Sequence, residues 1–304
     1  MPDLVRDTIF LALGGSQAHG TARAGSDVDV RGVCVVPLRE RLSLFGRFEQ
    51  HEGELPGPLL ARVERHLRAR ASGDDGLALV AVPPKTECLV FELGKFVSLL
   101  AAANPSALEV LFTDERDWVL DTPTWRALHA QRQLFLTRRV HQTFVGYAHA
   151  QLKRIETHRA WLLSPPTHEP TRSAFGPPGA PGDKAYRAAR KRWAQYLSWQ
   201  AHRNAQRAAL ERAHGYDTKH AMHLVRLMRM GLEALETGAL NVRREDAEEL
   251  RAIRDGALTF VELSALADEL TQRMAEVAPT SPLPEDVDTA RVDDLAVGLM
   301  LGSP

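Results

Sequence analysis

Two aspartates, Asp27 and Asp29, alternate with valines in DVDVRGVCVV, residues 27–36. This stretch otherwise has the composition of an apolar strand. Residues i and i+2 of a strand point to the same side, so both carboxylates are expected on one face. Like charges that close repel unless a cation lies between them, and Mg²⁺ prefers carboxylates together with phosphate oxygens. The pair therefore predicts a site for Mg²⁺ (or Mn²⁺) and a phosphorylated substrate.

The expected phosphate side of this site is the turn Gly14-Gly15-Ser16, which follows the short apolar run TIFLAL at residues 8–13. Free backbone N–H groups in such a turn can bind phosphate oxygens, and the Ser16 hydroxyl adds a donor. Ten residues separate Ser16 from Asp27, enough for one short helix and a return turn. We therefore expect the turn and the aspartates to lie side by side, in an arrangement that suits nucleotidyl transfer with two metal ions.

Strand, GGS turn, spacer and DVDV together resemble the polymerase β-type nucleotidyltransferase superfamily. Further segments resemble, in order, the predicted nucleotidyltransferases associated with RNA ligase and RNA repair: KFVSLLAAANPSALEVLF, QLKRIETHRAWLLSPP and GYDTKHAMHLVRLMRMGLEALETG. This resemblance covers roughly residues 8–276, apart from the segment 39–84. It implies transfer of NMP from an NTP, such as ATP, to a hydroxyl acceptor, with an RNA end or another nucleic acid as the expected acceptor.

The resemblance also implies a third carboxylate from a later strand, and Glu87 in TECLVF has the best position for it. Glu87 would then be the general base for the attacking hydroxyl or a metal ligand. Glu52 and Glu54 are weaker candidates, and Glu92 is expected to open the next helix, where the helix dipole favours an acid. The predicted catalytic and metal-binding residues are thus Asp27, Asp29 and Glu87.

Several basic residues are candidates for nucleotide binding. Arg31 shares the strand face of the aspartates and could neutralise their charge or bind phosphate. Lys219, His223 and Arg226 stand at i, i+4 and i+7 of one helical pattern, so they form a basic stripe that either faces triphosphate or nucleic acid or is a solvated face. His220 and His223 lie one turn apart, but no companion ligand has convincing spacing, so the sequence predicts no zinc site.

The order of local patterns predicts an α+β chain. Strands at 8–13, 28–36 and about 86–91 indicate an N-terminal nucleotidyltransferase domain, residues 1–120, with a mostly antiparallel or mixed sheet and a mobile insertion at about 39–84. An all-helical domain, residues 121–304, follows. Its expected helical patterns, around a Pro-rich loop at 164–183, lie at 123–163, 183–213, 217–237, 244–254 and 256–276.

Composition sets wider bounds. The chain has 304 residues, a formal net charge of −1 and two cysteines, Cys34 and Cys88, so neither a globally basic nucleic-acid binder nor a disulfide scaffold is indicated. We expect buried cysteines, no membrane segment and a cytoplasmic protein. Two alternatives to a nucleic-acid-modifying enzyme stay open: a toxin–antitoxin-type transferase acting on a protein or tRNA, and a catalytically inert nucleic-acid-binding protein. The sequence does not indicate the oligomeric state.

Overall fold

The computed structural model describes residues 2–71, 86–179, 181–203 and 205–302. The chain forms two compact units. The sheet unit contains residues 1–147, 226–250 and 269–304, and the helical unit contains residues 148–225 and 251–268. The sequence predicts instead a single boundary near residue 120. The chain passes from one unit to the other within helices, where no linker composition marks the change.

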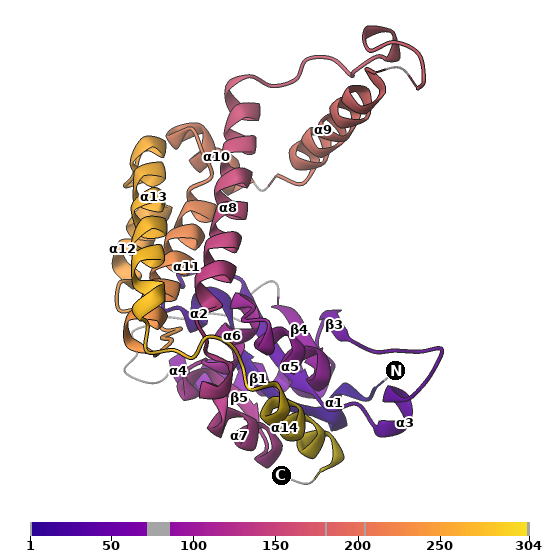
Figure 1. Cartoon of the computed structure of the whole chain (residues 1–304), viewed down its shortest axis with the longest axis vertical. Helices are drawn as coiled ribbons and strands as arrows, with labels where there is room; N and C mark the ends of the chain where they lie inside the picture. The colour runs from indigo at the N-terminus through magenta and orange to yellow at the C-terminus, as the bar shows by residue number, and fades with distance from the viewer. Residues whose placement is uncertain (1, 72–85, 180, 204, 303–304) are drawn as a thin grey trace. The chain divides into compact units, whose positions relative to one another are not determined.

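The sheet unit is built on a five-stranded mixed sheet of order β3-β4-β2-β1-β5, which confirms the predicted α+β class (Figure 1). β1 is antiparallel to both β2 and β5, β2 is parallel to β4, and β3 is antiparallel to β4. The sequence predicts the three central strands, whereas the edge strands β3 and β5 are additions. The strands are β1 Thr8–Leu13, β2 Val28–Cys34, β3 Gln50–Gly53, β4 Thr86–Glu92 and β5 Trp118–Asp121.

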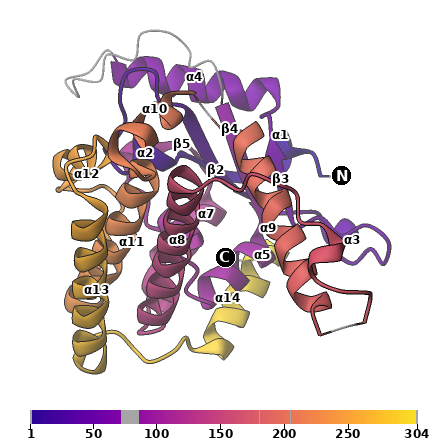
Figure 2. The ribbon, with the colours of Figure 1, turned by 90° about the horizontal axis from the view of Figure 1, so that it is seen from above.

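One face of the sheet is covered by α4 (Gly57–Ala71). Its apolar residues Leu59, Val63 and Leu67 recur every four positions, so they form one stripe, and all are buried in the same cluster as Val28 and Val30 of β2. Figure 2 shows α4 on the opposite side of the sheet from α5, α7 and α14. The segment expected to be a mobile insertion thus supplies a complete layer of this unit as far as residue 71; its remainder, residues 72–84, lies outside the described residues.

The other face packs against helices through aromatic rings. Phe10 of β1 stacks on Trp125 of α7 (Pro123–Ala130) with ring centroids 3.6 Å apart, and Trp118 meets Phe10 edge-on at 5.5 Å. All three side chains are buried, and each contributes a large apolar area to the core. The core of the sheet unit therefore has two layers, one on each side of the strands.

The helices of the sheet unit begin where the sequence places caps. The Asn104 side chain accepts a hydrogen bond from the Ala107 amide, and Pro105 is the first residue of α6. Glu92 ends β4 and caps α5 by accepting from the Lys95 amide, which confirms its expected place. The helices lying wholly in this unit are α1 Leu4–Asp7, α2 Gly15–Ala18, α3 Leu38–Arg41, α4, α5 Leu93–Ala101, α6 Pro105–Leu111, α7 and α14 Thr289–Leu301, with 3₁₀ turns Glu115–Asp117, Arg132–Phe135 and Ala278–Thr280.

The helical unit has an aromatic centre. Trp161 lies edge-on to Tyr196 at 5.7 Å and tilted against Trp199 at 5.4 Å. The Tyr216 hydroxyl donates to the Leu258 carbonyl over 2.6 Å and so joins distant segments of this unit. Its helices, four of which it shares with the sheet unit, are α8 Val140–Leu163, α9 Asp183–Ala201, α10 Ala205–His214, α11 Thr218–Thr237, α12 Ala247–Arg254 and α13 Phe260–Val277, with one 3₁₀ turn, Arg172–Ala174, in the Pro-rich loop.

The two cysteines are buried and free, as expected from their apolar surroundings. Burial raises the pKa of the Cys34 thiol to about 12, and burial also raises the pKa of Cys88. Both thiols are therefore protonated and poorly reactive at neutral pH. Among the described residues, no helix combines the length and the apolar character needed to cross a bilayer.

Candidate active site

The turn after β1 lies directly against β2. The Gly14 amide donates to the Asp29 carbonyl over 2.8 Å, and Gly15 then adopts a left-handed backbone, with φ +55°, as α2 begins. Few residues other than glycine adopt this conformation, so the second glycine of the pair is required by the backbone alone. The predicted phosphate turn and the predicted carboxylate strand are thus side by side, as the spacing indicates.

Close approach to Asp29 is a second reason for the glycines. A Cβ atom added to Gly15 would lie 2.0 Å from Asp29 Oδ2, and one added to Gly14 would lie 2.8 Å from the Cγ of Arg31. No real Cβ tolerates the first distance. The turn therefore forms a cradle around the Asp29 carboxylate that a side chain at position 15 would fill. Ser16, in the first turn of α2, is half-buried.

Asp29 and Glu87 are brought together by strand register. β2 and β4 pair in parallel with Asp29 opposite Glu87, and register partners on adjacent strands lie about 4.8 Å apart and point to the same face. Asp27 is exposed and immediately precedes β2, two residues before Asp29. In the described part of the chain, the carboxylate oxygens of these three residues do not all lie within 4.8 Å of one another. They share one region of the sheet without forming a closed ligand shell.

Arg31 pairs with Asp29. Its Nη2 donates to Asp29 Oδ1 over 3.2 Å, and its Nη1 donates to the Val30 carbonyl over 3.1 Å. Both side chains of the pair are about one-third exposed, at 31% and 30%, so solvent screens the interaction and its contribution to stability is small. The guanidinium is thus positioned to balance carboxylate charge beside the glycine turn, one of the two roles expected of it.

The three residues of the basic stripe on α11 differ in their surroundings. Arg226 is buried and donates to Glu109 Oε1 over 2.6 Å. The prediction that Arg226 faces nucleotide does not fit this position, because its guanidinium is engaged by a carboxylate inside the sheet unit. Lys219 and His223 are half-buried and belong to the helical unit. That these two residues bind nucleotide stays a prediction.

A buried network that sequence reasoning did not identify supports the glycine turn. His19, the C-cap of α2, is hydrogen-bonded through Nε2 to Glu109 Oε2 at 3.3 Å, and Glu109 in turn binds Arg226. The His19 carbonyl accepts from the Arg244 amide over 3.1 Å. The end of the turn is therefore fixed by side chains from α6 and α11, whose contribution only tertiary structure reveals.

Charge within this network is set by burial and by Arg226. Burial, reinforced by Arg226, lowers the pKa of His19, so its imidazole is neutral at pH 7 and donates Nε2–H to the carboxylate. Although burial acts in the opposite sense, Arg226 and His19 hold the pKa of Glu109 below its usual range. The network thus contains one carboxylate and one guanidinium around a neutral ring.

The donor set at the start of β2 and β4 fits a divalent metal. Oxygen ligands from Asp27, Asp29 and Glu87 are those that Mg²⁺ prefers, and Mg²⁺ commonly takes only one or two carboxylates and completes its shell with water and substrate phosphates. The cradle that a Cβ at Gly15 would fill leaves the Asp29 carboxylate open to the turn. Glu92, by contrast, is used as a helix cap and is paired with Arg41 at 3.4 Å.

Of three comparisons with known proteins, one identifies the family of this chain. The model of a family described as the RNA repair pathway DNA polymerase beta family matches residues 5–297. The comparison with curated proteins found no match. The comparison with solved structures found none either.

Proposed function

Because the chain belongs to the RNA repair pathway DNA polymerase beta family, a nucleotidyltransferase in RNA repair is supported, and we propose that it transfers NMP from an NTP to a hydroxyl group of an RNA end. The observation that carries the proposal is the contact between the glycine turn and Asp29, with Glu87 in register beside it. A phosphate-binding turn and paired carboxylates within one small region are the two requirements of this chemistry.

In the proposed site, Asp27, Asp29 and Glu87 hold Mg²⁺ or Mn²⁺, which supplies charge neutralisation for the triphosphate and activation of the attacking oxygen. The backbone amides of Gly14-Gly15-Ser16 and the Ser16 hydroxyl bind phosphate oxygens and orient the α-phosphate. Arg31 balances the remaining negative charge.

The transfer itself forms one bond and breaks another. The acceptor hydroxyl oxygen bonds to the α-phosphorus, the bond from that phosphorus to the bridging oxygen breaks, and pyrophosphate leaves with the bonding electron pair. A Glu87 carboxylate oxygen accepts the hydroxyl proton, since Glu87 is opposite Asp29 on the adjacent strand.

The test is a transfer assay with each radiolabelled NTP, Mg²⁺ or Mn²⁺, and an RNA oligonucleotide with a free 3′ hydroxyl. Wild-type protein is expected to label the RNA, and Asp29→Asn is expected to lose at least about 10³-fold of that rate, since metal stabilisation contributes several kcal/mol. Glu285→Gln is the control, because Glu285 is an exposed acid of the same unit and is no candidate for the site. Equal rates in wild type and Asp29→Asn would overturn the proposal, as would label found on the protein alone.

A further inference from the structure

A second group of metal-binding side chains lies in the helical unit. His158 of α8, Glu211 of α10 and Asp217, which directly precedes α11, each offer one ligand atom, and these atoms all lie within 4.8 Å of one another. In a tetrahedral site with bonds near 2.0–2.1 Å, neighbouring ligand atoms are about 3.4 Å apart. Small rotations of the three side chains would therefore close them around one ion.

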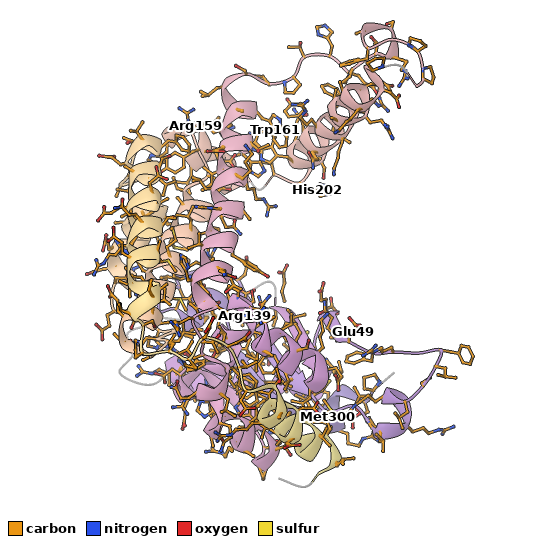
Figure 3. All side chains as sticks on the ribbon, viewed as in Figure 1. Glu49, Arg139, Arg159, Trp161, His202 and Met300 are labelled. Atoms are coloured by element: carbon orange, nitrogen blue, oxygen red, sulfur yellow. The ribbon has the colours of Figure 1, made fainter. Side chains whose placement is uncertain are left out.

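Both carboxylates of the group are nearly excluded from solvent: Glu211 is 3% exposed and Asp217 is 2% exposed. Burying an ionised carboxylate is costly unless a positive partner or hydrogen bonds stabilise it. The three side chains also line a cavity of about 580 Å³, and Trp161 and His220 are among the other residues that line it. Figure 3 shows Trp161 extending from α8 on the side that α9 occupies. The donors thus combine a low-dielectric setting with room for a ligand.

Hydrogen bonds already orient two of the donors. Asp217 accepts from the His220 amide through Oδ1 over 3.0 Å and from His220 Nδ1 through Oδ2 over 2.6 Å. Glu211 accepts from the Nε of Arg203 over 2.6 Å through Oε2. Neighbouring partners that fix the rotation of ligating side chains are typical of metal sites.

We propose that His158, Glu211 and Asp217 bind one divalent transition-metal ion, Zn²⁺ or Mn²⁺, in the helical unit, with His220 as a positioning residue for Asp217. One imidazole nitrogen with two carboxylate oxygens is a mixed donor set that such ions accept, whereas Mg²⁺ prefers oxygen alone. The cavity side of the group leaves positions for water or a further ligand.

Positively charged side chains near the proposed site repel a bound cation only weakly. Lys153 and Arg154 also line the cavity, but both are exposed, so solvent and salt screen their repulsion of a cation. Arg203 balances part of the charge of Glu211 in the structure. A dication bound between Glu211 and Asp217 adds to that balance, because it contacts both carboxylates at short range.

This site differs from the pair His220 and His223, which stands one helical turn apart and for which the sequence predicts no zinc site. His158, Glu211 and Asp217 are 53 and 6 residues apart and lie on three different segments, so no linear motif connects them. Only the packing of α8 against α10 and α11 brings the donors together. The proposal does not depend on the proposed function, since it concerns a separate set of ligands.

The experiment measures metal binding directly in the full chain carrying Asp27→Asn and Asp29→Asn, so that the catalytic acids do not contribute. Isothermal titration with Zn²⁺ and with Mn²⁺ gives stoichiometry and affinity, and Co²⁺ absorption reports coordination by the imidazole. One bound ion is expected. His158→Gln is expected to weaken binding by at least about tenfold and to change the Co²⁺ spectrum.

His202→Gln is the matched control, because His202 lines the same cavity but stands outside the ligand group, with its Nδ1 at 2.8 Å from the Ser198 carbonyl. Circular dichroism melting curves establish that both variants fold. Retained binding in His202→Gln with weakened binding in His158→Gln supports the site. No binding by the Asp27→Asn/Asp29→Asn chain, or equal binding by the two histidine variants, overturns it. Neither result bears on nucleotidyl transfer, which the wild-type transfer assay tests separately.

Discussion

The two candidate sites of this molecule are assembled in different ways. The site in the sheet unit is built almost entirely from residues 14–31, in which a turn and a strand meet through their own backbone. The group in the helical unit draws His158, Glu211 and Asp217 from three segments. A site of the first kind leaves a readable pattern in the sequence, because spacing and strand alternation fix its geometry. One of the second kind leaves none.

This contrast is not complete, because Glu87 and the His19 network join the first site from a distance. The sheet-unit site would be purely local if neither mattered. The following predictions separate its local and long-range parts.

The largest effect is expected for Glu87→Gln. If Glu87 accepts the hydroxyl proton, its replacement by an amide of the same shape removes the base and lowers the transfer rate by roughly 10²- to 10⁴-fold. Single-turnover kinetics at several pH values measure this, with Glu285→Gln, an exposed acid of the same unit, as the control. A rate within experimental error of wild type would show that residues 14–31 suffice for the chemistry.

A smaller loss is expected for Gly15→Ala. The new Cβ would collide with Asp29 Oδ2 and strain a left-handed backbone, so we expect the carboxylate to shift and the rate to fall by about 10²-fold. Gly25→Ala is the comparison, since Gly25 also has a positive φ, +77°, but has no atom within 4 Å of the added Cβ. It should cost about 1–2 kcal/mol of stability and little activity. Equal activity in both variants would argue against the cradle.

The smallest effect concerns Glu109→Gln and pH. The folded-state pKa of Glu109 is lowered, so its contribution to stability is fully present above the unfolded value of about 4.3 and is lost as the pH falls through the folded value. The variant should therefore be less stable than wild type at pH 7, by about 1–3 kcal/mol, and the difference should shrink toward pH 3.

Urea denaturation between pH 3 and pH 7 measures this difference, and Glu52→Gln provides an exposed-acid baseline. His19 also makes the protein less stable as the pH falls. Its pKa is lowered in the folded state, so below about pH 6.5 the unfolded chain binds a proton that the folded protein does not, and unfolding becomes more favourable. A difference between wild type and Glu109→Gln that is constant across pH would contradict the assigned ion pair with Arg226.

How much the sequence could predict depends on the range of the interactions. β1 matches its predicted span, Thr8–Leu13, because a continuous apolar run is buried on both faces. The edge strands β3 and β5 were not predicted: each has four residues, and QHEG carries no strand pattern at all. Partners on a neighbouring strand, rather than their own composition, make these segments extended.

Distant partners also determine the roles of α4 and of Arg226. α4 has a visible apolar stripe, but only the sheet beneath it makes that stripe part of the core. Arg226 stands in a basic stripe by sequence, yet Glu109, 117 residues earlier, determines its role. Spacing along one helix shows which side chains share a face, and it does not show what that face meets.

The burial of Cys34 and Cys88 has a practical consequence. These are the chain's two cysteines, and both thiols are protonated and buried. Maleimide and iodoacetamide should therefore react very slowly with the native protein. A cysteine introduced at an exposed position, such as Glu52 or Lys153, would then be the one residue that takes a fluorophore or spin label, without removal of the natural pair. Because the two natural cysteines do not take up the label, spectroscopy of a single labelled position is possible in either unit.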